Sequence, residues 1–267
     1  MIRDITIGQY YPAKSPIHRM DPRTKLFGTL IFIISVFLFH SVAGYAVATL
    51  FLAGMIIISQ VPVKFIFKGL KAIFMILMIT MVFNILLTPG EVLWKIGIFK
   101  ITREGISMAV RMAIRLVYLV IGSSLMTLTT TPNQLTDGLE KSLRPLNKIH
   151  IPVHEIAMMM SIALRFIPIL LEETDKNMKA QIARGADFES GNLIQKVKNM
   201  VPLLVPLFIS AFRRANDLAM AMEARCYHGG DNRTQMKPLH YTRRDHIAYV
   251  VLFVYLAVAI GFRVMGW

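Results

Sequence analysis

A stretch of about 34 residues without a charged side chain, residues 26–59, sets the first limit on how this chain folds. As one helix it would be about 50 Å long at about 1.5 Å per residue, whereas the hydrocarbon core of a bilayer is about 30 Å thick. The stretch therefore has to break, and the polar or small residues His40, Ser41 and Gly44 lie near its middle. We expect two antiparallel membrane spans joined by a very tight turn.

The composition agrees with a membrane protein. Of the residues, 55% are hydrophobic and 17% are charged, and the mean hydropathy is +0.53, which excludes an ordinary water-soluble enzyme. The formal net charge of +14 suits loops that face anionic lipid. Nucleic-acid binding is not expected, because the aromatic residues that could stack on bases are concentrated in the apolar stretches.

The apolar pattern predicts an all-α, polytopic membrane protein with five spans. The spans are expected near residues 26–41, 43–60, 69–88, 106–130 and 247–262. Residues 131–245 hold 12 of the 16 acidic residues and 16 of the 30 basic residues. We therefore expect an N-terminal membrane domain at 1–130, a block of cytoplasmic or interfacial helices at 131–245, and a C-terminal span within 246–267.

Basic residues near the spans indicate the orientation. They form two clusters, before the first span and between the second and third, made of Arg19, Arg23, Lys25, Lys64, Lys68 and Lys71. The positive-inside rule places both clusters in the cytoplasm. The amino terminus and the block at 131–245 are then cytoplasmic, while the loop at 91–104 and the carboxyl terminus lie outside. Residues 1–16 lack the apolar core of a signal peptide, so the first span is expected to direct insertion.

Two arginines, Arg111 and Arg115, lie one helical turn apart inside the fourth expected span. A charge in that position is unfavourable by about 2.5 to 3.5 kcal/mol on insertion scales. Two interpretations stay open. The arginines lie near the outer interface and reach headgroups or carbonyl groups, or they form a substrate or anion site.

The cytoplasmic block is expected to begin with a short amphipathic helix at 134–149. Its basic residues Lys141, Arg144 and Lys148 recur at intervals of three and four, which puts them on one face. Such a stripe is usually a solvated face.

Two longer helices in the block share one design. The first is apolar over 156–171 and becomes charged before it ends; the second is apolar over 200–212, with Pro202 and Pro206 expected to bend its start, and then also becomes charged. Sixteen apolar residues are few for a span, so the first is expected to lie against protein or at the interface. The ends consist of Ala183, Arg184 and Gly185 in the first helix and Ala224, Arg225 and Cys226 in the second.

The matching arginines Arg184 and Arg225 are 41 residues apart. One arginine at a helix end ordinarily caps local carbonyl groups. Its planar guanidinium also holds a carboxylate through two hydrogen bonds, and a cation is favoured at a helix carboxyl end. Because two helices end in this way, docking onto a partner is the preferred interpretation.

Catalytic and metal-binding residues are not expected. His150 and His154 have the spacing of zinc ligands on a helix, but Pro152 lies between them. Three acidic residues crowd together where the first long helix becomes polar, and a solvated face is the preferred explanation for Glu172, Glu173 and Asp175. The single cysteine, Cys226, excludes a disulfide within the chain and a cysteine cage for a metal.

Together these features resemble the transmembrane T component of energy-coupling factor (ECF) transporters. The resemblance rests on Asp-Pro-Arg-Thr-Lys at 21–25, Ala-Arg-Gly at 183–185 and Ala-Arg-Cys at 224–226, and on the order of four spans, a helical cytoplasmic block and a last span. It extends over nearly the whole chain.

The resemblance implies partners and roles. In that family two Ala-Arg-Gly motifs end coupling helices that dock into grooves on two ABC-type ATPase subunits, and the remaining surface holds a small membrane protein, the S component, that binds vitamin or metal. By this resemblance, Arg184 and Arg225 would be the docking residues. The protein itself would lie in a bacterial cell membrane. The ATPases would use ATP and Mg²⁺, and this chain would bind no cofactor. Cys226 stands where the family has glycine, and its Cβ disfavours a left-handed backbone.

The sequence also limits what the chain does by itself. It contains no G-x-x-x-x-G-K-[ST] motif, so it is not expected to hydrolyse ATP, and energy has to come from another subunit. The expected function is the energy-transducing scaffold of a vitamin or metal importer. The alternative is a self-contained secondary transporter, suggested by Arg111 and Arg115 but disfavoured by five spans without an inverted repeat. A membrane-embedded enzyme is a third reading, but the spans offer only His40.

Overall fold

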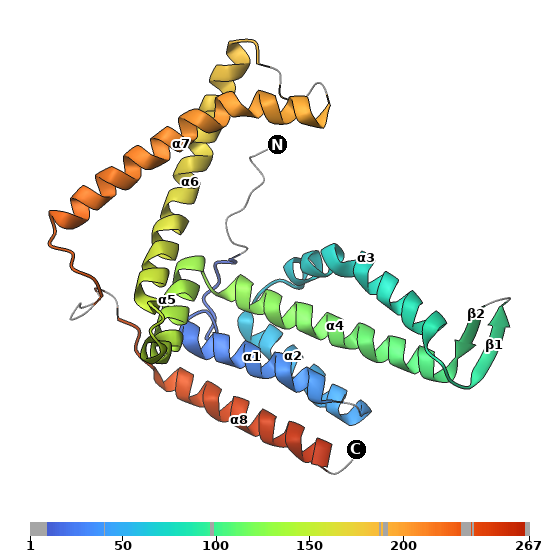
Figure 1. Cartoon of the computed structure of the whole chain (residues 1–267). Coiled ribbons are helices and arrows are strands. Elements are labelled where there is room, and N and C mark those ends of the chain that lie inside the picture. Colours follow the sequence, from blue (N-terminus) through green and yellow to red (C-terminus); the bar gives the residue numbers. More distant parts are fainter. Residues whose placement is uncertain are drawn as a thin grey trace. The chain divides into compact units, whose positions relative to one another are not determined.

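The computed structural model describes residues 10–39, 41–96, 99–186, 188, 192–230, 236 and 238–264. These fall into two compact units (Figure 1). The bundle unit is the described part of Gly8–Gly138 and Leu239–Trp267, and the crossed-helix unit is the described part of Leu139–Pro238. Helices make up both units, with one two-stranded hairpin among the described residues, which confirms the expected all-α class.

The bundle unit contains α1 (Pro22–Leu38), α2 (Val42–Ser59), α3 (Val63–Leu87), α4 (Arg103–Thr129) and α8 (Arg243–Val264). The long apolar stretch breaks between α1 and α2. There the Ser41 hydroxyl accepts a hydrogen bond from the Gly44 N–H at 3.2 Å, which caps α2. A Cβ on Gly44 would overlap the Phe39 ring, so the tight turn requires glycine. His40 lies outside the described residues.

The expected loop at 91–104 contains a hairpin, in which β1 (Val92–Ile96) pairs antiparallel with β2 (Phe99–Thr102). The hairpin was not anticipated because its strands are only four and five residues long. Thr102 ends the hairpin and begins α4, since its hydroxyl accepts a hydrogen bond from the Gly105 N–H at 3.1 Å.

The core of the bundle joins helices that are distant in the sequence. Its buried side chains come from α1, the turn that follows it, α2 and α8, and they are Phe32, Val36, Phe39, Tyr45, Ala48, Leu52, Tyr255 and Ala259. The hydroxyl groups of Ser35 and Tyr255 lie 2.7 Å apart, so each satisfies the other inside this apolar core. The last helix is therefore an integral part of the bundle.

By length and composition, α2, α4, α6 and residues Arg243–Phe262 of α8 can cross a membrane, and α3 qualifies as the bent pair Val63–Lys71 and Ile73–Leu87. Many large apolar side chains of the bundle, such as Phe74, Met75 and Phe83, are exposed as lipid-facing residues are. This supports a multi-pass membrane protein. α6 passes the same criterion although it falls in the expected cytoplasmic block, and the location of that block stays a prediction.

The crossed-helix unit holds the two long helices, α6 (Val153–Ala183) and α7 (Leu193–Glu223). They are preceded by α5 (Pro132–Leu143) and the 3₁₀ helix η2 (Arg144–Ile149). The expected single helix at 134–149 is wrong, because Pro145 has no N–H for an α-helical bond and the chain tightens after Leu143. The three basic residues predicted on one face are thus divided between α5 and η2.

α7 begins at Leu193, ahead of the apolar run, so Pro202 and Pro206 lie inside the helix and not at its start. Pro206 has no N–H with which to bond the carbonyl of Pro202, four residues earlier. The side-chain amide of Gln181 on α6 donates to that carbonyl at 3.4 Å. The Pro202 carbonyl, which lacks its helical donor, is therefore hydrogen-bonded by a side chain of α6.

Candidate functional site

The first arginine end (Ala183, Arg184 and Gly185) closes α6 with a Schellman motif. The Gly185 N–H donates to the Ile182 carbonyl at 2.9 Å, and the Ala186 N–H donates to the Gln181 carbonyl at 3.0 Å. Gly185 has a φ of 87°, in the left-handed region that glycine adopts without strain. Arg184 is thus the last residue before the chain reverses.

The second arginine end (Ala224, Arg225 and Cys226) has the same hydrogen bonds, each moved by 41 residues. The Cys226 N–H donates to the Glu223 carbonyl at 2.8 Å, and the Tyr227 N–H donates to the Met222 carbonyl at 3.1 Å. Cys226 has a φ of 55°, so it adopts the left-handed conformation despite its Cβ. The departure from glycine therefore leaves the geometry of this helix end unchanged.

Neither arginine caps its own helix. The side chains of Arg184 and Arg225 are exposed, and neither forms a hydrogen bond or ion pair with any residue that the structure describes. Three of the last carbonyl groups of each helix accept backbone N–H groups, namely those of Ala180, Gln181 and Ile182 in α6 and of Met220, Met222 and Glu223 in α7. Local capping does not explain these arginines, and both guanidinium groups are available to an external carboxylate.

Helices α6 and α7 cross each other (Figure 1), and an ion pair joins them. The guanidinium of Arg214 on α7 donates to a carboxylate oxygen of Glu173 on α6 at 2.6 Å. These two residues are also 41 positions apart, and each lies eleven residues before its own arginine end. The two arms from this ion pair to the tips are therefore equally long, about 16 Å at about 1.5 Å per residue. Sequence reasoning missed this pair, although the 41-residue offset could have revealed it.

The other acidic and histidine candidates have structural roles or none. Glu172 is exposed, as expected for a solvated face, whereas Glu173 is held by Arg214. His154 Nδ1 lies 2.8 Å from the Glu140 carboxylate. Among the described residues, no three His, Cys, Asp or Glu side chains are grouped so that they could hold a metal ion.

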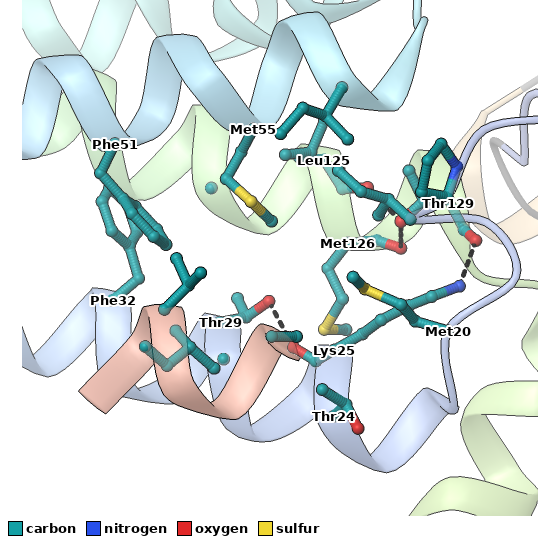
Figure 2. Close-up of a pocket in the computed structure, with 18 of the residues that line it drawn as sticks. Met20, Thr24, Lys25, Thr29, Phe32, Phe51, Met55, Leu125, Met126 and Thr129 are labelled. Carbon is teal, nitrogen blue, oxygen red and sulfur yellow. Dashed lines mark hydrogen bonds between the residues drawn. The ribbon is translucent and has the colours of Figure 1, made fainter. Parts of the chain in front are cut away.

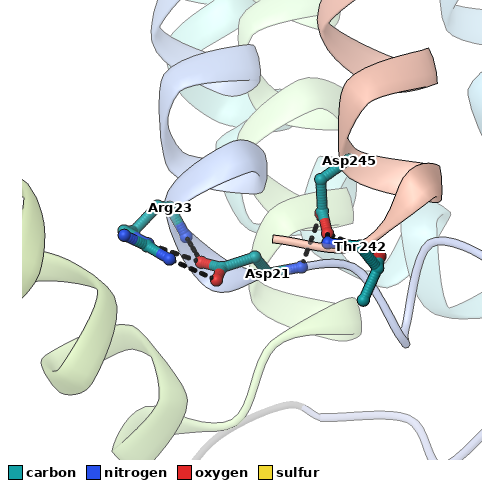
Figure 3. Close-up of polar contacts among 4 residues, drawn as sticks. All are labelled: Asp21, Arg23, Thr242 and Asp245. Carbon is teal, nitrogen blue, oxygen red and sulfur yellow. Dashed lines mark hydrogen bonds and ion pairs between the residues drawn. The ribbon is translucent and has the colours of Figure 1, made fainter. Parts of the chain in front are cut away.

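In the bundle unit, the Asp-Pro-Arg-Thr-Lys segment at 21–25 ties the start of α1 to the start of α8 (Figure 3). Asp245 closes a capping box: its carboxylate accepts from the N–H of Thr242 at 2.8 Å and from the Thr242 hydroxyl at 2.7 Å. Its second oxygen accepts the Asp21 N–H at 2.8 Å. Asp245 is fully buried, so these bonds satisfy a desolvated charge. The sequence analysis missed Asp245, although Thr-x-x-Asp before an apolar run is a recognisable capping pattern.

The same segment carries three charged side chains, Asp21, Arg23 and Lys25. The Asp21 carboxylate caps α1 by accepting the Arg23 N–H at 2.9 Å, and it pairs with the Arg23 guanidinium at 2.8 Å. The Lys25 ammonium, 8% exposed, donates to the carbonyl groups of Thr129 at 2.8 Å and His18 at 3.2 Å. This segment therefore organises one end of the bundle, because it joins α1, α4 and α8.

A cavity of about 320 Å³ lies next to Lys25, between α1, α2, α4 and α8 (Figure 2). Its walls are mostly apolar and include the flexible side chains of Met20, Met55 and Met126. Because the Lys25 ammonium is engaged by carbonyl groups, this cavity has no reactive group among its lining residues that suggests catalysis.

His18 is buried beside this end of the bundle. Its Nε2 donates to the Tyr11 carbonyl at 2.9 Å, and its Nδ1 lies 2.7 Å from the Ser15 hydroxyl oxygen. Burial lowers the pKa of His18. The hydrogen bond to the Tyr11 carbonyl raises this pKa, whereas the nearby Lys25 ammonium lowers it further.

The two arginines of α4 differ. Arg115 donates to the Phe39 carbonyl at 3.3 Å and to the Tyr45 hydroxyl at 3.4 Å, and its guanidinium lies 5.3 Å from the centre of the Phe37 ring. It thus binds the end of α1, where a cation is favoured. Arg111 is exposed. These contacts match the carbonyl-binding interpretation, and the observation that suggested a secondary transporter has a structural explanation.

Comparison with known proteins gives consistent matches. Residues 13–236 match the family described as cobalt transport protein, CbiQ. The energy-coupling factor transporter transmembrane protein EcfT of Clostridium kluyveri is 57% identical over 266 residues, which cover 99% of this chain and 98% of that protein. Proteins of the same name from Ruminiclostridium cellulolyticum and Bacillus subtilis are 55% and 48% identical; the matches cover 96% and 98% of this chain and 96% and 100% of those proteins. This chain therefore belongs to the CbiQ family of energy-coupling factor transporter transmembrane proteins, multi-pass membrane components of multi-subunit transporters and not a family of enzymes.

Proposed function

We propose that the two arginine ends dock onto two ABC-type ATPase subunits, and that α6 and α7 transmit their ATP-driven closure to a membrane-embedded subunit that binds vitamin or metal. The observation that carries this proposal is the pair of helix ends with the same backbone geometry. Each presents one exposed arginine, and neither arginine has a partner within the described chain.

The crossing of α6 and α7 supports a lever mechanism. The Glu173–Arg214 pair joins the helices at positions equally distant from the two tips. A displacement of the tips is therefore passed through this contact to the first halves of both helices.

The first halves of α6 and α7 suit an apolar partner. Large side chains are exposed along them, including Met159, Met160, Val205 and Phe208. Apolar surface of this extent is covered in a stable assembly, here by lipid or by the subunit that binds the substrate. The methionines are adaptable side chains and suit a surface that accepts more than one partner.

In this mechanism the chain forms no chemical bond and holds no cofactor. The ATPase subunits bind ATP and Mg²⁺, and the substrate-binding subunit determines which vitamin or metal is carried. The arginine ends and the amino terminus lie on the cytoplasmic side, since ATP is supplied there and the basic clusters favour it.

The test is charge reversal at both ends. Arg184→Glu with Arg225→Glu in a tagged chain, co-expressed with its ATPases and purified in mild detergent, is expected to lose more than about nine-tenths of the bound ATPase, because like charges then face the docking carboxylates. ATP-driven uptake in proteoliposomes is expected to fall equally.

The control is Arg213→Glu, which reverses another exposed arginine of α7 that has no hydrogen bond or ion pair among the described residues. This variant is expected to keep its ATPases and its uptake. Retention of ATPases and uptake by the double variant would overturn the proposed docking.

A further inference from the structure

A second cavity lies in the crossed-helix unit, between the first half of α6 and the end of α7. It has a volume of about 560 Å³. Its walls come from both helices and from the segment after α7, and they include Ile162, Arg165, Arg225, Cys226 and His228. Two of these residues are arginines, and none of the described residues in the wall carries a carboxylate.

Arg165 is out of place in its own helix. It interrupts the apolar first half of α6, and its side chain is exposed at the cavity. Among the described residues it makes no hydrogen bond or ion pair, and Arg225 on the opposite wall makes none either. Two exposed guanidinium groups without a paired carboxylate make the potential at this cavity positive, which attracts an anion.

The cavity is a built part of the second arginine end. His228 Nδ1 lies 2.8 Å from the Cys226 carbonyl oxygen, which accepts its hydrogen bond. Next along the chain, a Cβ on Gly230 would overlap the His154 ring on α6, so glycine allows the chain after α7 to pass close to that helix. The ring is fixed by the hydrogen bond between His154 and Glu140.

The first arginine end has different residues at the matching positions. Moved by 41 residues, Arg165 corresponds to Pro206 and Ile162 to Leu203. Leu203 is buried, 3% exposed, and Gln181 donates to the neighbouring Pro202 carbonyl. Apolar packing and a neutral hydrogen bond thus stand where the second end has an arginine and a cavity.

We infer that this cavity receives an acidic side chain of the ATPase subunit that docks at the second arginine end, and that Arg165 and Arg225 bind its carboxylate together. This inference rests on the proposed function and adds a second arginine to it. An acidic protein side chain is the occupant because Arg225 is itself the docking residue, so the nearest anion is carried by the docked subunit. The two ends are then unequal, and the second holds its ATPase more tightly.

The native thiol at the cavity permits a direct test on the full chain. Cys226 is the only cysteine, is exposed and lines the cavity. Its rates of reaction with an anionic and a cationic methanethiosulfonate reagent are compared in the purified chain. Arg165→Gln is expected to lower the anionic-to-cationic rate ratio about fivefold, because one of two attracting charges is removed, while the control Arg213→Gln leaves it unchanged. A ratio that does not respond to Arg165→Gln would overturn the inference.

The complex provides the second readout. Bound ATPases are expected to protect Cys226 from both reagents, and Arg165→Gln is expected to lower ATPase recovery about fivefold in mild detergent, since one bidentate contact is lost. Arg165→Lys restores the charge but not the planar fork, so recovery should be intermediate.

Two outcomes separate the possible failures. If Arg184→Glu with Arg225→Glu releases the ATPases but Arg165→Gln does not, the cavity inference is wrong and the proposed docking stands. If Cys226 is protected without ATPases in phosphatidylglycerol nanodiscs but not in phosphatidylcholine nanodiscs, a lipid headgroup occupies the cavity and the inference is also overturned.

Discussion

The ends of α6 and α7 share their backbone hydrogen bonds and differ in their surroundings. Both close with a Schellman motif that leaves an arginine exposed. The first end uses Gly185 and has apolar packing at Leu203, whereas the second uses Cys226 and opens into a cavity that contains another arginine. Local backbone geometry was duplicated, while the environment that decides what each arginine binds was not.

This difference separates two properties of a docking element. The position of the guanidinium depends on the helix end and on the length of the arm, which are the same in both helices. The strength of binding depends on neighbouring charges and on desolvation, which differ. Variants that exchange or remove these features therefore test the two properties independently.

The largest expected difference is between single charge reversals. Arg225→Glu should lower ATPase recovery more than tenfold and Arg184→Glu several-fold less, because a glutamate at position 225 repels the docked carboxylate and also pairs with Arg165, so that both arginine contacts are lost at the second end. Recovery per tagged chain is measured over a salt series, with Arg213→Glu as the control. Equal losses at both ends would remove the asymmetry.

The crossing pair tests whether the arms act as one lever. Glu173→Arg or Arg214→Glu alone places like charges at the 2.6 Å contact and is expected to lower ATP-driven uptake about tenfold while most of the ATPase stays bound. The exchange Glu173→Arg with Arg214→Glu restores opposite charges, and uptake should recover by at least half. Uptake that stays normal in both single variants would show that the pair is not needed for transmission.

The residue in the left-handed position can be exchanged between the ends. Cys226→Gly should stabilise the second end by about 1 kcal/mol and Gly185→Cys should weaken the first by about the same amount, because only glycine adopts this backbone without strain. Since trypsin cuts after Arg184 and Arg225, the cleavage rate at each site reports local opening. A change of about 1 kcal/mol corresponds to about fivefold in that rate. If both exchanges leave the rates unaltered, the backbone strain at Cys226 is negligible.

The smallest expected effect is a pH dependence of the stability of the bundle unit, which defines the pH range in which the two helix ends can be compared. The folded bundle lowers the pKa of His18, so the unfolded chain binds the proton more readily. The contribution of His18 to the free energy of unfolding is therefore fully present above the ordinary histidine pKa of about 6.5. It is lost as the pH falls from there through the lowered pKa of the folded state. Thermal unfolding of the bundle should occur at lower temperature in acid, and His18→Gln should weaken that dependence. If the wild type and His18→Gln respond equally to acid, His18 is not the group involved.

Several features were predictable because their signals are local. The break after Leu38 follows from a stretch too long for one span, and the helix ends at 183–185 and 224–226 follow from glycine, arginine and the change from apolar to charged residues. The all-α class follows from the length and spacing of the apolar stretches. The prediction of a single helix at 134–149 was wrong although its signal was local too. It followed the spacing of the basic residues and did not take account of Pro145.

Other features were not predictable because they join distant positions. Asp21 and Asp245 are 224 residues apart, and no spacing rule connects a capping box on the last helix with the start of the first. Arg165 looks like an isolated charge in an apolar helix until α7 places Arg225 across the same cavity. Gln181 has no evident role until Pro206 leaves a carbonyl of α7 without a donor.

The amino-acid sequence by itself determined the long apolar helices, the ends of α6 and α7 and the two arginines at their tips, since capping, helix breaking and hydropathy act over a few neighbouring residues. Only the tertiary structure decided that an ion pair joins the two arms at equivalent positions and that a second arginine lines the cavity at one tip. Those outcomes depend on which side chains two helices bring together, and packing across a long interval of chain leaves no short-range pattern.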